Sequence, residues 1–181
     1  NNLECLLWME RLHRSRGRVR VVFAGPALDR VYAAAFEKEI RRCSGFARWA
    51  GTIPPSVMRS AYDSVDAVLN TSRQEGLSNI LLEAMAAGKP LLASRVPGNI
   101  EPLGGDGREA PRGYLFDLND PEDFLHGAAR IVDDEAYRRE LVEGCREWAA
   151  RLPSPEEEAR SLSGVYADVH ASCCGPTGSM V

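Results

Sequence analysis

The sequence has few cysteines and histidines, and their placement excludes two classes of small protein. Its five cysteines are an odd number with irregular spacing, and two of them, Cys173 and Cys174, are adjacent. Disulfide frameworks and zinc sites need paired, regularly spaced ligands, so neither is predicted. The three histidines, His13, His126 and His170, lie far apart. We therefore expect no metal site and no bound cofactor, and predict a reducing, cytoplasmic compartment.

Long apolar runs and a strong excess of one charge are also lacking. No apolar stretch approaches the roughly 20 residues that cross a bilayer, and no basic start followed by an apolar run indicates a signal peptide. The formal net charge of −4 provides no basic surface for nucleic acid. We expect neither a transmembrane segment nor a nucleic-acid partner. The chain opens without Met inside a helix-like segment, which predicts a fragment.

What is present is an ordinary share of apolar residues, 44% of the 181 residues, in alternating strand-like and helix-like segments. Short apolar or β-branched runs predict strands at 19–24, 46–50, 67–71, 91–94 and 113–116. Helical periodicity fills the stretches between and after them. Such alternation predicts parallel strands joined by helical crossovers. The predicted fold class is α/β, a Rossmann-like parallel sheet with helices on both faces.

The C-terminal part carries a clear helix-start signal. Ser154 and Glu157 have the spacing of a capping box, which predicts a last helix running to about Val169. We expect one domain over residues 1–170. The tail at 171–181 has Gly, Ser, Cys and Pro without periodicity and is expected to be disordered.

The loop that follows the strand at 67–71 is the most informative part of the chain. It contains Glu75 and Gly76, and a helix is predicted to start near Leu77 or Ser78. The free N–H groups of a helix's first turn attract anions, and a glycine allows a phosphate to approach the backbone closely. The loop is therefore a candidate anion-binding site.

Glu83 lies one to two turns into the same predicted helix. The apolar residues of that helix define its expected buried arc: Leu77, Ile80, Leu81, Ala84 and Met85. At 100° per residue, Glu83 lies roughly 130° from the centre of the arc. Periodicity alone therefore permits a solvent-exposed Glu83 without a function, just as Glu75 could be an ordinary polar loop residue.

Several landmarks follow one another in a fixed order along the chain. The first landmark is Glu75-Gly76. Seven residues separate Glu75 from Glu83, and the run Ala84–Pro90 follows Glu83 directly. Pro97-Gly98-Asn99 and the run Arg112–Phe116 come later. This order resembles the signature of family 4 glycosyltransferases of the GT-B type. The resemblance covers nearly all the chain outside the tail and implies the C-terminal, nucleotide-sugar-binding half of a GT-B fold.

The resemblance also implies roles for individual residues. Glu83 would accept hydrogen bonds from the donor ribose, and Glu75 would face the donor sugar near the reacting carbon as the catalytic residue. The backbone at Gly76, Leu77 and Ser78 would hold the diphosphate. The family needs no metal ion, because the helix N-terminus stabilises the leaving diphosphate. Family 4 members retain the configuration of the sugar, so retention is implied.

Gly98 and Asn99 are further donor-binding candidates. They could contribute a backbone N–H and a side-chain amide to the phosphates or the sugar, although a simple tight turn would use the same residues. The donor implied by the resemblance is a nucleotide sugar, with a UDP-sugar favoured and GDP behind it.

The partner implied by the resemblance is an N-terminal acceptor domain that this chain lacks, together with a basic Arg–Lys pair that family members carry at the start of the donor domain. The isolated chain is therefore expected to be inactive and to leave a sheet edge or an apolar crevice exposed. A non-catalytic form that binds nucleotide or a protein partner is the alternative. A dinucleotide-binding domain is disfavoured, because no G-x-G-x-x-G follows the first predicted strand.

Overall fold

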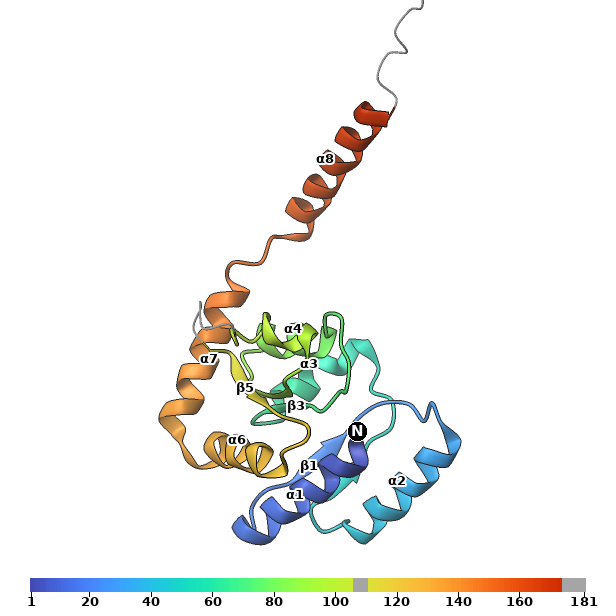
Figure 1. The fold of residues 1–181 in the computed structure, drawn as a ribbon, viewed down its shortest axis with the longest axis vertical. Coiled ribbons are helices and arrows are strands. Elements are labelled where there is room, and N and C mark those ends of the chain that lie inside the picture. Colours follow the sequence, from blue (N-terminus) through green and yellow to red (C-terminus); the bar gives the residue numbers. More distant parts are fainter. Residues whose placement is uncertain (106–110, 174–181) are drawn as a thin grey trace, which may run out of the picture. The chain divides into compact units, whose positions relative to one another are not determined.

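The computed structural model describes residues 1–105 and 111–173 (Figure 1). Its strands form two parallel sheets, one with the order β1-β2 and one with the order β3-β4-β5. The strands are β1 (Val21–Phe23), β2 (Ala47–Trp49), β3 (Val68–Asn70), β4 (Leu91–Ser94) and β5 (Gly113–Phe116). All five overlap the predicted strand positions, and the α/β class is confirmed.

Helices connect and flank these strands. Three of them begin after aspartates that accept backbone N–H groups of the first turn: Asp29 from Tyr32, Asp120 from Glu122 and Asp134 from Tyr137, each at 2.9 Å. Such caps satisfy donors that a helix start leaves free. The helices are α1 (Asn2–Arg16), α2 (Arg30–Arg42), α3 (Pro55–Asp63), α4 (Asn79–Ala86), α5 (Pro97–Ile100), α6 (Pro121–Asp133), α7 (Glu135–Ala149) and α8 (Pro155–Cys173).

The chain divides into two compact units, and the boundary along the sequence lies between Ala149 and Ala150. The first unit holds all five strands and helices α1 to α7, and α8 belongs to the second. The first unit thus ends at Ala149, before residue 170. The expectation of one domain over residues 1–170 stays a prediction.

Helix α8 starts as its capping box predicts but ends later. The Ser154 N–H donates to Glu157 Oε2 at 2.7 Å, and the Glu157 N–H donates to Ser154 Oγ at 3.2 Å. The helix continues past Val169, so residues 171–173 are helical and the expectation of disorder is wrong for them. Ordinary helix formers fill this last turn, and a lack of sequence periodicity does not prevent a helix. The rest of the predicted tail, 174–181, lies outside the described residues.

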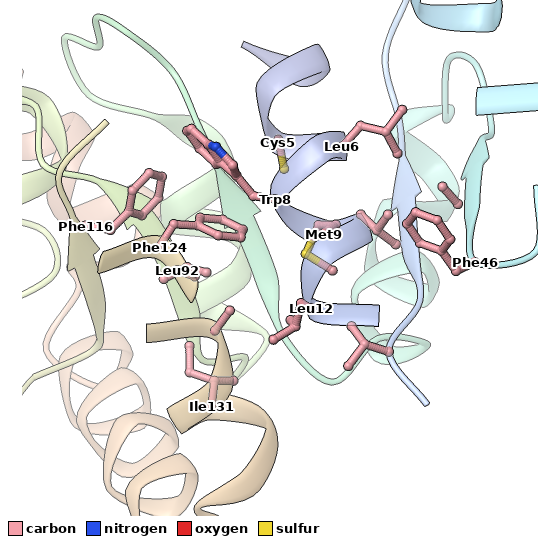
Figure 2. Packing of buried hydrophobic residues seen from close by; sticks show 14 of the residues in the cluster. Cys5, Leu6, Trp8, Met9, Leu12, Phe46, Leu92, Phe116, Phe124 and Ile131 are labelled. Atoms are coloured by element: carbon pink, nitrogen blue, oxygen red, sulfur yellow. The ribbon is translucent and has the colours of Figure 1, made fainter. Parts of the chain in front are cut away.

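Helix α1 packs into a core that includes side chains of both sheets. Figure 2 shows Trp8 pointing towards Phe116 and Phe124, whereas Leu6 points to the opposite side of α1, where Phe46 lies. The ring centroids of Trp8 and Phe124 are 4.9 Å apart, and those of Phe116 and Phe124 are 5.1 Å apart in an edge-to-face arrangement. All five side chains belong to one buried cluster, so α1 holds the two sheets in a common core.

Among the described residues, each sheet has two outer strands, and each outer strand has one edge without a ladder partner. Within residues 1–105 and 111–173, β1 pairs only with β2, and β3 pairs only with β4. Because every open sheet has outer edges, the expectation of an edge or apolar crevice left exposed by a missing domain stays a prediction. Because no ladder joins β1 to β3 in this part of the chain, side-chain packing under α1 carries the connection between the sheets.

We predict that Trp8→Ala lowers the free energy of unfolding of the chain by about 3–5 kcal/mol, because it removes the aromatic centre of this core and leaves a cavity. Trp8 is 8% exposed, whereas its neighbour Leu7 is 51% exposed. Leu7→Ala is the matched control and should change stability by no more than about 0.5 kcal/mol. Denaturant unfolding followed by circular dichroism measures both, and equal effects of the two variants would contradict the assignment.

Candidate functional site

The carboxyl ends of β3 and β4 lie side by side. The two strands are parallel, with Asn70 opposite Ala93, so β3 ends at Asn70 and β4 ends at Ser94 on the same edge of the sheet. The loop 71–78 leaves β3 at this edge, and α5 follows β4 there. Open parallel sheets bind their ligands beyond such an edge.

Helix α4 begins at Asn79, one residue after the later of its two predicted starts, and Ser78 is its N-cap. The Ser78 side chain makes no capping bond to the first turn. Its hydroxyl instead accepts a hydrogen bond from Asn70 Nδ2 at 3.2 Å. Because the first N–H groups of a helix have no intrahelical acceptor, the start of α4 keeps donors and positive dipole charge available for an anion.

The buried face of α4 is narrower than the periodicity predicts. Leu81, Ala84 and Met85 are fully buried, but Leu77 is 59% exposed and Ile80 is 48% exposed. Leu77 lies before the helix, so helical periodicity does not apply to it. Ile80 lies roughly 90° from the centre of the observed arc, at its margin. The expectation that both are buried is wrong.

A hydrogen-bond network joins the two strand ends to the loop. Asn70 Nδ2 donates to Glu75 Oε1 at 3.0 Å, and Asn70 Oδ1 accepts the Ser72 N–H at 3.0 Å. Ser94 Oγ donates to the Ser72 carbonyl at 2.6 Å. Asn70 is 5% exposed and Ser94 is fully buried, and hydrogen bonds strengthen in such a low-dielectric setting. The network therefore orients the half-buried carboxylate of Glu75.

Gly98 brings α5 into direct contact with the Glu75–Gly76 backbone. A Cβ atom at position 98 would lie 2.5 Å from the Glu75 carbonyl oxygen and still closer to that of Gly76. No side chain fits at this distance, so the contact requires glycine. A Cβ atom at Gly76, in contrast, would meet nothing within 4 Å, which leaves open space beside the start of α4.

Asn99, the next residue of α5, is fully buried. Its Nδ2 donates to the Ser94 carbonyl at 2.9 Å and lies 3.4 Å from Asn70 Oδ1. Among the described residues, no donor reaches Asn99 Oδ1. Exchanging the nitrogen and oxygen of the Asn99 amide would place its oxygen next to the Ser94 carbonyl oxygen, and two acceptors repel each other. The orientation of the amide is therefore determined by this contact. Because the amide nitrogen faces Ser94 and Asn70, a contact of Asn99 with the donor stays a prediction.

Glu83 lies exposed on the second turn of α4 and receives a hydrogen bond that the sequence did not indicate. The Tyr62 hydroxyl, from the C-terminal turn of α3, donates to Glu83 Oε2 at 2.9 Å. Tyr62 is 7% exposed. Burial, and then the neighbouring Glu83 carboxylate, raise the pKa of Tyr62 well above its usual value, so the phenol stays a hydrogen-bond donor at all physiological pH values.

The structure thus brings together Glu75, Gly76, Ser78, Gly98 and Asn99 at one sheet edge and sets Glu83 one to two turns along α4. Within residues 1–105 and 111–173, no group of three or more His, Cys, Asp or Glu side chains could hold a metal ion. No helix in the same part of the chain is both long and apolar enough to cross a membrane. The cytoplasmic location stays a prediction.

The sequence model of the family described as "Glycosyl transferases group 1" matches residues 5–134. The chain belongs to this family. Its similar proteins include D-inositol 3-phosphate glycosyltransferase from Corynebacterium jeikeium, 30% identical over 80% of this chain and 33% of the relative. Glycosyltransferase 1 domain-containing protein 1 from Xenopus tropicalis is 26% identical over 75% of this chain and 37% of that protein. The chain therefore spans about a third of these curated relatives' length.

Solved structures show the same fold. Sucrose-phosphate synthase from Thermosynechococcus elongatus superimposes with a TM-score of 0.76 at 20% identity, over 95% of this chain and 44% of that chain. HepE from Anabaena, solved in complex with UDP and glucose, superimposes with a TM-score of 0.72 at 17% identity, over 86% of this chain and 44% of its own. The predicted GT-B type of α/β fold is confirmed.

Sequence reasoning missed Tyr62 and Asn70 as parts of this candidate site. Tyr62 is 21 positions from Glu83, and no motif links them. Asn70 carried one weak signal, since an amide at the end of an apolar strand needs a buried partner. The proposed roles of Gly76, Leu77 and Ser78, in contrast, were predicted from the family signature.

We predict that Gly98→Ala destabilises this glycosyltransferase domain by about 1–3 kcal/mol, because the added methyl group overpacks the contact with the Glu75–Gly76 backbone. Gly76→Ala is the matched control: its methyl group enters open space and should leave stability nearly unchanged. Thermal unfolding of both variants measures the difference. A Gly98→Ala variant as stable as Gly76→Ala would show that the loop and α5 are not in close contact.

Proposed function

We propose that this glycosyltransferase domain binds a nucleotide-diphosphate sugar, and that the full-length protein transfers the sugar to an acceptor with retention of configuration. One observation carries the proposal: the uncapped start of α4 lies between two carboxylates, Glu75 in the preceding loop and Glu83 on the next turns. A nucleotide sugar presents matching groups, a diphosphate between a ribose and a sugar.

The start of α4 would hold the diphosphate. The backbone of Gly76, Leu77 and Ser78 approaches the helix N-terminus, and the space around Gly76 is open. In transfer, the bond between the sugar's anomeric carbon and the phosphate oxygen breaks, and its electron pair leaves with the nucleoside diphosphate. The helix dipole and N–H groups already face this developing negative charge, so they stabilise the transition state with little reorganisation. The proposed chemistry needs no metal ion.

Glu83 would bind the ribose. A carboxylate offers two acceptor oxygens, and the two vicinal hydroxyls of a ribose are donors, so the groups match in number and polarity. The exposure of Glu83 leaves its carboxylate accessible to a ligand on the surface of α4.

Glu75 would face the reacting carbon of the sugar. As the leaving group departs, the sugar ring becomes oxocarbenium-like, and a nearby carboxylate stabilises the positive charge. The acceptor oxygen then bonds to the same face of the anomeric carbon and gives its proton to the phosphate oxygen of the departing nucleoside diphosphate. The hydrogen bond from Asn70 would keep the Glu75 carboxylate in place during this step.

A UDP-sugar is the favoured donor, supported by the UDP and glucose bound in the similar structure of HepE. The acceptor site would lie in an N-terminal domain of the full-length protein, since the chain spans about a third of its relatives. We propose that the chain without that domain binds nucleotide but does not turn over. The second candidate function, a non-catalytic nucleotide- or protein-binding form, rests on the same short span.

We predict that the chain binds UDP saturably and that Glu83→Ala weakens this binding by tenfold or more, about 1.4 kcal/mol, because the ribose loses its carboxylate partner. Isothermal titration calorimetry with UDP, GDP and their common sugar derivatives measures both affinities and identifies the preferred base.

Glu140→Ala, which removes an exposed glutamate on α7, is the matched control and should bind UDP like the unmodified chain. Binding that is equally strong in Glu83→Ala would exclude the proposed ribose contact. No binding of any nucleotide, in this chain or in a longer protein that contains it, would refute the donor site itself.

A further inference from the structure

Tyr62 reaches the candidate site from outside the family signature. It lies near the end of α3, whereas Glu83 is on α4, and its hydroxyl is 2.9 Å from Glu83 Oε2. Among residues 1–105 and 111–173, no donor is bound to the other carboxylate oxygen, Oε1. The carboxylate thus has one oxygen held by the protein and one available to a ligand.

The ring of Tyr62 is anchored, although the carboxylate that it contacts is exposed. The ring belongs to a buried cluster with Leu81, Ala84 and Met85, the residues that form the underside of α4. Tyr62 therefore presents its hydroxyl from a fixed position, 7% exposed, to a flexible side chain on the surface. A free glutamate samples several rotamers and loses that freedom on binding a ligand. A fixed donor removes part of this cost beforehand.

The chemistry of the donor is equally specific. A lysine or arginine in this place would neutralise the carboxylate and compete for both oxygens. A phenol has a single proton to donate. It holds one oxygen and leaves the negative charge and the lone pairs of the other oxygen for the ligand.

We propose that Tyr62 is a positioning residue for ribose recognition: its hydroxyl holds Glu83 Oε2 so that Oε1 accepts a ribose hydroxyl of the nucleotide. The inference rests on the proposed function, because it assumes that Glu83 meets the ribose. It assigns the specificity for the ribose to two helices, α3 and α4.

The test compares two probes, UDP and inorganic pyrophosphate, which has no ribose. Tyr62→Phe removes only the hydroxyl and keeps the ring in its cluster. We expect it to weaken UDP binding about fivefold, the size of one lost hydrogen bond, and to leave pyrophosphate binding unchanged. Calorimetric titration of the same chain with each probe measures both. A merely structural role would weaken the two probes alike.

Tyr114→Phe is the matched control. Tyr114 also donates its hydroxyl to a carboxylate, Asp123 Oδ1 at 2.6 Å, so the same bond type is lost away from α4, and UDP binding should not change. Tyr62→Phe added to Glu83→Gln should weaken UDP binding no further than Glu83→Gln alone, because both changes act through one contact.

Three results would overturn the inference. Unchanged UDP affinity in Tyr62→Phe, while Glu83→Ala weakens binding, refutes the role of Tyr62 and leaves the proposed function standing. Equal losses for UDP and pyrophosphate show a structural role only. No binding of any nucleotide, in this chain or in a longer protein that contains it, refutes the proposed function and this inference with it.

A second measurement does not depend on how the variant folds. In the unmodified chain with ¹³C-labelled tyrosine, the phenol-carbon signal of Tyr62 should shift when UDP is added but not when pyrophosphate is added, because only the ribose changes the Glu83 contact. Identical spectra with the two probes would also overturn the inference.

Discussion

The packing of α1 across two separate sheets is the interaction on which the rest of this domain depends. No ladder joins β1 to β3 within residues 1–105 and 111–173, so backbone hydrogen bonds do not connect the two halves there. Aromatic and aliphatic side chains around Trp8 do so instead, in one buried cluster with Phe46 on one side and Phe116 on the other. Close-packed interiors have low compressibility. The packed core therefore restricts movement of the strands whose ends carry the candidate site.

At that edge, backbone contacts are as important as side chains. The Glu75–Gly76 loop rests on Gly98, whose missing side chain allows α5 to approach. The buried amide of Asn70 binds the loop at Glu75, and the amide of Asn99 in turn contacts Asn70. These contacts restrict the loop before any ligand binds. Pre-organisation of this kind is what binding an anion at a helix start requires, because each donor must already point at the charge.

The two carboxylates of the site are held by neutral donors. An amide contacts Glu75 and a phenol contacts Glu83, so neither carboxylate loses its charge to a cationic partner. Each of these hydrogen bonds orients a carboxylate and leaves oxygen lone pairs that can accept hydrogen bonds from a ligand. The positive end of α4 lies between them and offsets the repulsion that two carboxylates would exert on a diphosphate.

The sequence by itself determined the α/β class, the position of each strand and the family signature around Glu75 and Glu83, because alternation, caps and motif spacing are local properties of the chain. Only the tertiary structure decided the rest. It exposed Leu77 and Ile80, which periodicity had assigned to the core, because α4 begins only after Leu77 and its buried arc is narrower than predicted. It also brought Tyr62 to Glu83, a contact between helices that depends on how α3 and α4 pack and that no spacing along the chain encodes.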